Sequence, residues 1–288
     1  MKLMSYLSSA GPGFGVVRTD GSVVDAGRRL GPGCGTLKAA LEQDRLPEIA
    51  QWADSAPSDH DLALLSPLPV IPQPGKIVCV GLNYLAHRIE GEHAPEAKAP
   101  AIFLRVPESQ VGHGGAIVCP IESDDLDFEA EVAVVIGRRG RRIAVEEALN
   151  WVAGISAYND ASVRDWQSAA GQWAPGKNFP CTGAFGPWLV TTDELPLTRS
   201  LSLVCRVNGQ EMQRSCTDLM IFSVAQLISH ISTFCTLEPG DVIVTGTPGG
   251  VGMRRSPPVW LCDGDIVEVE LEGVGILRNS VRKERLAD

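Results

Sequence analysis

The alternation of hydrophobic and polar positions along the chain predicts a structure built mainly of short strands. From Lys76 onward, short apolar runs bounded by glycine recur, which is typical of buried strands. Strands and helices do not alternate regularly and no long segment repeats, so we expect an α+β fold with a mixed, largely antiparallel sheet. In this part of the chain, helical patterns are confined to a few stretches, at residues 85–92, 145–151, 161–170 and 223–235.

The first part of the chain is set apart by its turns and prolines. Residues 19–22 (Thr-Asp-Gly-Ser) give a turn signal between two strand-like segments, and residues 37–52 have a helical pattern. Four prolines between residues 66 and 75 exclude a regular helix there and indicate a linker. We therefore predict a small N-terminal α+β domain at residues 1–70 and a main domain at residues 71–288.

Acidic residues alternate with apolar ones immediately before a wholly apolar run, residues 132–136. Asp127, Glu129 and Glu131 would share one face of a continuous strand, and the side chains of Glu129 and Glu131 could reach one ion. The simpler alternative is an edge strand with a solvated acidic face. Two features favour a bound cation: the strand enters a core, where unpaired carboxylates are costly, and it carries no Lys or Arg.

A third oxygen ligand is available at Asp160, where a strand-like run ends before a helical segment. Its alternative role is that of a helix N-cap. The sequence has no His or Cys cluster typical of zinc, and three carboxylates favour Mg²⁺ or Mn²⁺.

Two further segments carry residues suited to proton transfer and charge stabilisation. His87 and Glu90 are three apart on a short helix, so Glu90 could orient His87 and raise its basicity, although an incidental surface pair has the same spacing. Lys177 could bind a carboxylate or stabilise an enolate, although surface lysines are the more common case.

Residues 240–252 form a strand that ends in a glycine loop, Thr-Gly-Thr-Pro-Gly-Gly-Val-Gly. Such a loop lets backbone N–H groups approach an anion, although a tight connection would look the same. It lacks the Gly-Lys-Ser/Thr of a Walker loop, and prolines follow where a dinucleotide-binding helix should begin.

Composition and charge narrow the class of partner. A formal net charge of −10 disfavours nucleic acid and anionic membranes. The eight cysteines are scattered singly, without a Cys-x-x-Cys motif or the short spacing of a disulfide framework, which indicates reduced thiols. No apolar leader or membrane-spanning run is evident, so we expect a cytoplasmic protein that does not bind membranes.

The order of these features resembles the fumarylacetoacetate hydrolase superfamily over about residues 76–283, and residues 1–70 resemble the N-terminal domain of its longer bacterial members. The matching stretches are residues 81–84 with His87 and Glu90, residues 126–131, Asn159-Asp160 with Arg164-Asp165, Gly176-Lys177 with residues 186–188, and residues 245–252.

The resemblance implies a rolled mixed sheet, usually a homodimer, with Mg²⁺ or Mn²⁺ on Glu129, Glu131 and Asp160. It also implies that His87, supported by Glu90, is the general base and that Lys177 and Thr247 contact substrate. We further place Gly246 and Gln172 among the expected substrate-binding residues.

The function expected from the resemblance is hydrolysis of a carbon–carbon bond in a 2,4-dioxo acid, an acylpyruvate or fumarylpyruvate, through a metal-stabilised pyruvate enolate. The alternative is a decarboxylase or isomerase of oxaloacetate-like or 2-hydroxy-dienoate catabolic intermediates. A metal-dependent dicarboxylate binder without catalysis is less favoured. Cys216 and Leu219 stand where many members have Asn and Asp, and Asn178 replaces a frequent Ser, which leaves the substrate open.

Overall fold

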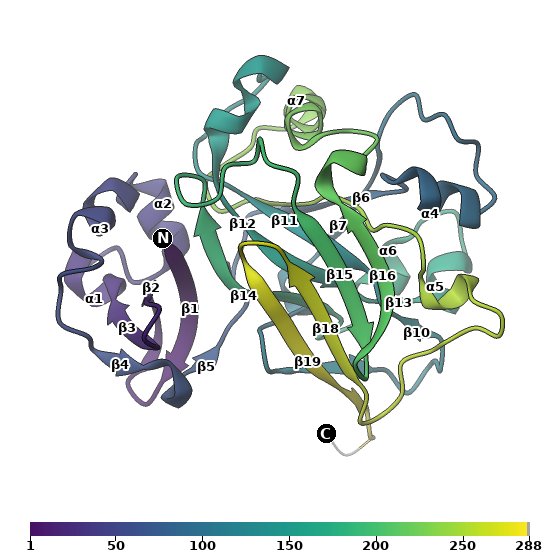
Figure 1. Cartoon of the computed structure of the whole chain (residues 1–288), viewed down its shortest axis with the longest axis horizontal. Coiled ribbons are helices and arrows are strands. Elements are labelled where there is room, and N and C mark those ends of the chain that lie inside the picture. The colour runs from purple at the N-terminus through teal and green to yellow at the C-terminus, as the bar shows by residue number, and fades with distance from the viewer. Residues whose placement is uncertain (287–288) are drawn as a thin grey trace.

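The computed structural model describes residues 1–286, and two β-sheets dominate it (Figure 1). The larger sheet has twelve strands, of which ten follow the order β4-β3-β2-β1-β14-β12-β11-β17-β6-β7; β5 pairs with β1 and β8 with β14. The strands are β1 (Lys2–Ser8), β2 (Gly11–Val17), β3 (Ser22–Asp25), β4 (His60–Asp61), β5 (Ser66–Pro67), β6 (Ile77–Gly81), β7 (Ala101–Arg105), β8 (Gln110–Val111), β11 (Ala130–Ile136), β12 (Val152–Asp160), β14 (Gly183–Thr191) and β17 (Val242–Val244).

A five-stranded sheet of order β16-β15-β18-β19-β9 packs against the large one. Among the described residues the parallel pairs are β6/β17, β8/β14 and β9/β19, and the remaining pairs are antiparallel. The expected α+β class with a mixed, largely antiparallel sheet is therefore confirmed. The strands are β9 (Ala116–Cys119), β15 (Ser202–Val207), β16 (Gln210–Cys216), β18 (Ile266–Leu271) and β19 (Gly275–Lys283); β10 (Leu126–Asp127) and β13 (Ser162–Val163) form a separate pair.

Strand β11 shows how the sequence builds the core on both sides of the large sheet. Its seven residues are all buried, and successive side chains point to opposite faces. Val132 and Val134 pack toward the five-stranded sheet, whereas Ala133 and Val135 pack toward the N-terminal segment. A run that is apolar on both faces is what a strand buried on both sides requires.

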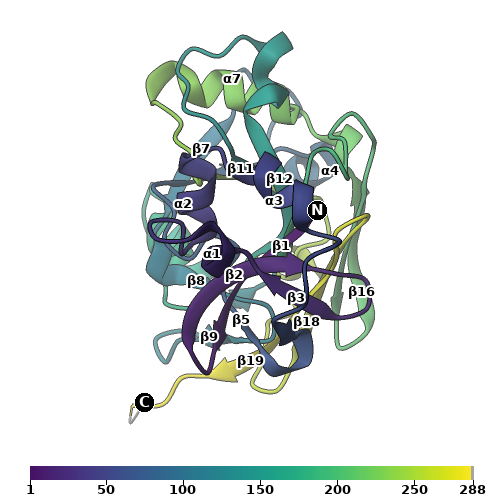
Figure 2. The same ribbon diagram turned by 90° about the vertical axis from the view of Figure 1, so that its left-hand side faces the viewer.

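The N-terminal segment extends the large sheet through β1, which pairs with β14 at Lys2↔Val190 and Leu3↔Leu189. Figure 2 shows its helices in front of β11 and β12, and their buried side chains share a hydrophobic cluster with these strands. The boundary at residue 70 stays a prediction. These helices are α1 (Ala26–Leu30), α2 (Leu37–Glu42) and α3 (Leu46–Trp52).

The single helix expected at residues 37–52 is wrong, because the chain breaks it between α2 and α3, where Asp44 adopts φ 52°. The other helical stretches correspond to α4 (Leu85–Glu90), a 3₁₀ helix at Val145–Trp151, α5 (Arg164–Ser168) and α7 (Val224–Phe234). Helix α7 begins with a capping box between Ser223 and Gln226. Short elements complete the fold: α6 (Ala174–Lys177) and 3₁₀ turns at Leu62–Leu64, Pro107–Ser109, Thr217–Leu219 and Gly252–Arg254. None of the helices in residues 1–286 is long and apolar enough to cross a membrane.

Candidate active site

Three acidic side chains converge at the ends of β11 and β12. Glu131 lies on β11, Asp160 ends β12, and Glu129 directly precedes β11, where its carbonyl accepts a hydrogen bond from the Asp160 N–H at 2.9 Å. All three are buried, and each offers one carboxylate oxygen within 4.8 Å of the others. We call these three residues the carboxylate cluster. Antiparallel pairing of the two strands thus brings together the residues that the sequence suggested as metal ligands.

The continuous strand expected through Asp127, Glu129 and Glu131 is wrong, because residues 128 and 129 separate β10 from β11. Side chains satisfy the backbone there: Asp127 Oδ1 accepts from the Phe128 N–H at 2.8 Å, and Asn159 Oδ1 accepts from the Glu129 N–H at 2.9 Å. The Asp127 carboxylate also accepts from Gly252 N (2.7 Å) and Met253 N (3.0 Å). Asp127 therefore anchors the glycine loop and lies outside the cluster.

Three buried cations surround these carboxylates. Lys177 Nζ lies 2.7 Å from Glu129 Oε2 and 2.7 Å from Asp160 Oδ2. Arg164 bridges Glu129 Oε1 at 2.7 Å and Asp127 Oδ2 at 2.8 Å, and Arg105 pairs with Asp160 Oδ1. Lys177 was expected to face substrate; it lines the cavity, yet its ammonium group is bonded to the cluster.

The charges do not balance at this site. Counting Asp127 with the cluster, four carboxylates face three cations, which leaves one negative charge. Burial would raise the pKa of Glu129, but Lys177 and Arg164 outweigh it and hold that pKa at about 2. Glu131 has no ion-pair partner within residues 1–286, and burial together with the Asp160 and Glu129 carboxylates holds its pKa well above the usual range. Protonation of Glu131 therefore relieves the charge imbalance when no cation is bound.

The donor set fits a divalent cation. Two oxygens bound to one Mg²⁺ at ~2.1 Å lie at most about 4.2 Å apart, so the 4.8 Å limit of the cluster requires only a small adjustment. A cation would also compensate the unbalanced charge and ionise Glu131. The ligand atoms are carboxylate oxygens alone, which suits hard ions such as Mg²⁺ and Mn²⁺. Glu129, Glu131 and Asp160 are thus the residues that could hold the metal.

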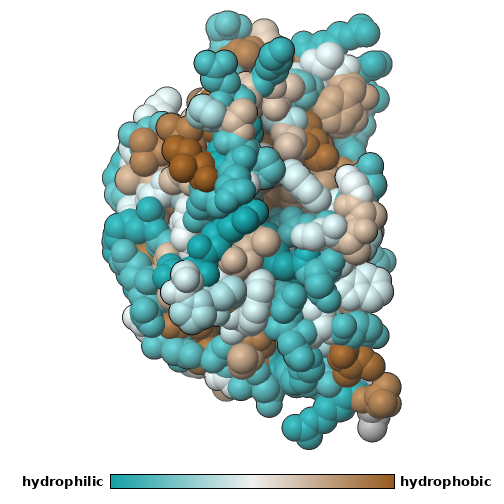
Figure 3. Space-filling model, turned by 90° about the vertical axis from the view of Figure 1, so that its right-hand side faces the viewer, coloured by the Kyte–Doolittle hydropathy of each residue, from teal (hydrophilic) through white to brown (hydrophobic). Residues whose placement is uncertain are grey.

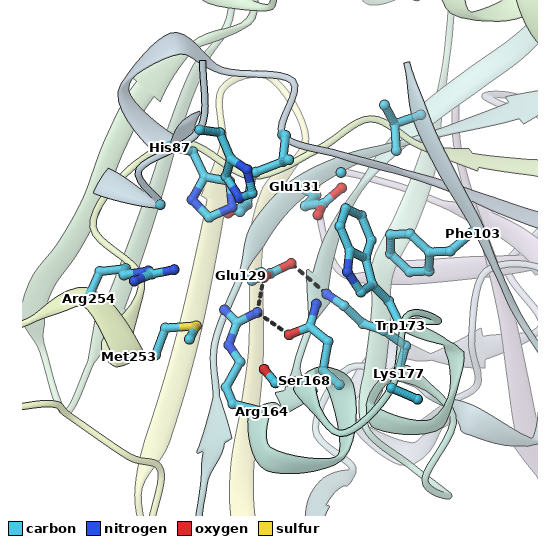
Figure 4. Close-up of a pocket in the computed structure, with 18 residues that line it drawn as sticks. His87, Phe103, Glu129, Glu131, Arg164, Ser168, Trp173, Lys177, Met253 and Arg254 are labelled. Atoms are coloured by element: carbon cyan, nitrogen blue, oxygen red, sulfur yellow. Dashed lines mark hydrogen bonds and ion pairs between the residues drawn. The ribbon is translucent and has the colours of Figure 1, made fainter. Parts of the chain in front are cut away.

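His87 and Glu90, expected to act as a pair, are bonded in the structure. His87 Nδ1 lies 2.7 Å from Glu90 Oε1, and Glu90 Oε2 accepts a hydrogen bond from the Gly250 N–H at 2.7 Å. A carboxylate at Nδ1 favours a proton on that nitrogen, which leaves the lone pair of Nε2 as the base. His87 lines the same cavity as Glu129 and Glu131 (Figure 4).

The glycine loop connects the cluster to this pair. Gly246 N–H donates to Glu131 Oε2, so Gly246, expected to bind substrate, holds a predicted metal ligand instead of lining the cavity. Thr247 does line the cavity, and its hydroxyl donates to Ala130 O at 3.0 Å while accepting from Gln213 Nε2 at 2.8 Å. Gln213 therefore fixes the orientation of the Thr247 hydroxyl.

The cavity has a volume of about 300 Å³ and opens on the face that carries α4 and α5. Figure 3 shows that face as mostly hydrophilic, with scattered hydrophobic residues. Gln172, expected to contact substrate, is exposed and does not line the cavity; the neighbouring Trp173 does so, opposite Arg254 (Figure 4). The other lining residues are Val80, Gly81, Leu82, Gly91, His93, Phe103, Gln167, Ser168, Ala170 and Met253.

Several residues that shape the site were not expected from the sequence. Arg164 was noted only as part of a motif, and its position four residues after Asp160 was the available signal. Arg105 and Gln213 act 55 and 83 residues from their partners Asp160 and Ala130. No local pattern in the sequence indicates such distant contacts.

Residues 76–282 match the family model described as "Fumarylacetoacetate (FAA) hydrolase C-terminal". The chain belongs to the fumarylacetoacetate hydrolase family. The family resemblance drawn from the site motifs is thereby confirmed.

Relatives in this family carry out different reactions. The chain is 40% identical over 272 residues to "Oxaloacetate tautomerase FAHD2A, mitochondrial" from Bos taurus, covering 88% of this chain and 86% of that protein. It is 31% identical to the crystal structure of 5-carboxymethyl-2-hydroxymuconate delta-isomerase from Mycobacterium smegmatis, with a TM-score of 0.79 over 99% of this chain and 100% of the other.

A third relative, maleylpyruvate hydrolase from Sphingobium sp. SYK-6, was solved in complex with manganese(II) and pyruvate. It is 25% identical, with a TM-score of 0.82 over 99% of this chain and 100% of the other. The family is thus one of enzymes with tautomerase, isomerase and hydrolase members. Together with the acidic cluster of this chain, these relatives support a divalent metal and a small substrate.

Proposed function

We propose that this chain is a metal-dependent enzyme that transfers a proton at the carbon beside the 2-oxo group of a small 2-oxo acid, with keto–enol tautomerisation of oxaloacetate as its reaction. The observation that carries the proposal is the placement of a carboxylate-paired histidine in the same cavity as an undercompensated carboxylate cluster. A base and a cation site that share one cavity are the two components an enolisation needs. The name of the bovine relative supports the choice of oxaloacetate.

The metal would be Mg²⁺ or Mn²⁺, held by Glu129, Glu131 and Asp160. When bound, it supplies a Lewis acid that polarises the 2-oxo group and makes the hydrogen on C3 more acidic. The residues of the chain then handle the proton. His87 Nε2 takes it from C3, and Glu90 stabilises the imidazolium through the 2.7 Å contact at Nδ1. A proton from solvent on the enolate oxygen completes enol formation. In the reverse direction the enol oxygen loses its proton to solvent, and the same nitrogen returns a proton to C3.

Lys177 and Arg164 maintain the charge and position of the ligands. Both bind Glu129 directly, and Lys177 also binds Asp160. Burial would lower the pKa of Lys177, but the carboxylates of Asp160 and Glu129 outweigh it and raise that pKa, so the ammonium stays charged. We infer that these cations keep Glu129 ionised and hold the side chains of Glu129 and Asp160 in place before a metal or substrate arrives.

Hydrolysis of an acylpyruvate is the second candidate. Phe103 and Trp173 form an apolar wall of the cavity, which an acyl chain would use and a four-carbon dicarboxylate does not need. In that reaction His87 would take a proton from water instead of from carbon. A decarboxylase would release CO₂ from the same substrate. The homodimer and the cytoplasmic location also stay predictions.

The three reactions are separated by their products. The enol of oxaloacetate is added to the full-length protein with Mg²⁺, Mn²⁺ or EDTA; loss of the enol absorbance is followed, and keto product is trapped with malate dehydrogenase. We expect metal-dependent acceleration without release of pyruvate. Pyruvate and CO₂ from oxaloacetate would indicate decarboxylation, and pyruvate with acetate from acetylpyruvate would indicate hydrolysis. An unaccelerated enol decay with either metal would contradict the tautomerase proposal.

A further inference from the structure

Arg254 is the one permanent cation lining the cavity whose side chain has no hydrogen-bond or ion-pair partner within residues 1–286. The other two, Arg164 and Lys177, are neutralised by the carboxylates around the cluster. Figure 4 shows the side chain of Arg254 directed into the cavity, on the side opposite Phe103 and Trp173. Arg254 is an exposed residue, so a ligand anion can reach it.

The backbone that carries Arg254 is fixed on both sides. Before it, the N–H groups of Gly252 and Met253 both donate to Asp127. After it, the Arg255 side chain donates to Gly250 O at 3.2 Å and to Met212 O. The neighbours of Arg254 are therefore used to hold the loop, whereas its own side chain is left to face the cavity.

Asp127 also connects this loop to the cluster. Arg164 bridges Asp127 and Glu129, so the loop position is set relative to a predicted metal ligand through two ion pairs. Such a connection fixes the separation between the metal site and the base of the Arg254 side chain. A substrate that spans the cavity would meet a cation site at one end and a guanidinium at the other.

The charge count shows which group Arg254 would bind. The four buried carboxylates and three buried cations leave one negative charge; a divalent metal and one chelating substrate carboxylate bring the cluster to neutrality. The first carboxylate of a substrate is thus compensated without Arg254. For a second carboxylate, remote from the metal, this guanidinium is the one permanent cation lining the cavity that is not already paired.

We propose that Arg254 binds the distal carboxylate of a 2-oxo dicarboxylate and selects such substrates over 2-oxo acids with an uncharged end. The inference rests on the proposed function and holds for either tautomerisation or cleavage. Arg254 is a specificity residue and takes no proton in the reaction.

The test is calorimetric titration of the full-length protein loaded with Mg²⁺. The matched ligands are 2-oxoglutarate and 2-oxopentanoate, which differ only in a terminal carboxylate, and oxalate reports the metal chelate alone. We expect the native protein to bind 2-oxoglutarate about 10-fold or more tighter than 2-oxopentanoate. Arg254→Gln should abolish that preference without changing the affinity for oxalate, and Arg254→Lys should restore part of it.

Turnover gives an independent readout. With oxaloacetate, Arg254→Gln should raise KM about 10-fold and change kcat by less than about 3-fold, because a remote ionic contact is made in ground and transition states alike. Arg138→Gln, which removes an exposed arginine that does not line the cavity, is the matched control and should leave both constants unchanged.

The possible failures are distinguishable. Retained oxalate binding with an undiminished dicarboxylate preference in Arg254→Gln would overturn the inference alone. An equal loss of preference in Arg138→Gln would also overturn it, since the effect would then follow net charge. A native protein that does not bind oxalate in the presence of Mg²⁺ would overturn the proposed function and this inference with it.

Discussion

The carboxylate cluster is held at the middle of a twelve-stranded sheet, whereas the His87–Glu90 pair stands on α4, a six-residue helix without a buried residue. Strands on both sides of β11 and β12 fix the cluster through backbone hydrogen bonds. Helix α4 has no side-chain N-cap, and Ile89 is 61% exposed. The sheet thus fixes the groups that must bind an ion at set spacing, while the base is placed on the accessible wall of the cavity.

The wall is nevertheless tied to the sheet at defined points. The Asn83 side chain donates to Thr245 O at 2.8 Å and to Phe222 O at 3.0 Å, just before α4. Glu90, at the end of the helix, accepts from Gly250 N–H. Substitutions in the two regions should therefore have different effects. Changes in the carboxylate cluster should lower metal affinity, and changes in the cavity wall that carries His87 and Glu90 should lower turnover.

The largest effect is expected from His87→Asn. Removing the base should lower turnover of oxaloacetate enol about 10³-fold, since general bases contribute ~10²–10⁴-fold. The Mg²⁺ affinity measured by calorimetry should stay unchanged, because His87 is not one of the predicted metal ligands. His230→Asn, at an exposed position on α7, is the control. A large loss of Mg²⁺ affinity in His87→Asn would contradict the division between the two sides.

Glu131→Gln tests the cluster from the other side. We expect Mg²⁺ affinity to fall on the order of 100-fold, because the amide cannot supply the negative charge that the cation compensates. The metal-free variant should keep or raise its Tm, since a buried carboxylate without an ion-pair partner is removed. Glu146→Gln, at an exposed acidic position, is the control. Undiminished Mg²⁺ affinity would reject Glu131 as a ligand.

Gly250→Ala should weaken the connection between wall and sheet. Gly250 adopts φ 102°, and a Cβ there would lie 2.5 Å from Met212 O, so the backbone must shift and its hydrogen bond to Glu90 is disturbed. We expect about 10-fold slower turnover with unchanged Mg²⁺ affinity. Gly209→Ala has a comparable positive φ (79°) with open space around the added carbon, and controls for strain alone. Equal turnover in the two variants would mean that the Gly250 contact does not position the base.

The smallest effect is a pH dependence confined to the cluster. Because the folded-state pKa of Glu131 lies above its unfolded value, the metal-free protein should gain stability as pH falls from 8 toward 5, whereas Glu131→Gln should not. Glu129 has the opposite sign: its folded pKa of about 2 gives stability above about pH 4.5 that is lost toward pH 2. Thermal unfolding of both proteins in EDTA measures the difference. If Tm changed with pH equally in the native protein and Glu131→Gln between pH 8 and 5, the raised pKa of Glu131 would be contradicted.

Period-two patterning and motif order were sufficient to predict the α+β class and to identify the three members of the cluster. The pattern failed where side chains replace strand hydrogen bonds, as at Asp127, whose carboxylate binds a loop 125 residues away. The substrate contact of Gln172 stays a prediction, and the structure places the neighbouring Trp173 against the cavity. Contacts such as Arg105 with Asp160 depend on packing between distant segments, which local periodicity does not record.

Three residues at four-residue spacing in the glycine loop and the turn after it serve the site: Gly246 binds Glu131, Gly250 binds Glu90, and Arg254 faces the cavity. The length of this segment therefore sets the positions of the three residues relative to one another. Insertion or deletion of a single residue between positions 246 and 254 would change the spacing of at least one of these three positions from the other two. An exchange at position 254 would leave the length intact, so substrate preference can diversify there while the chemistry is preserved.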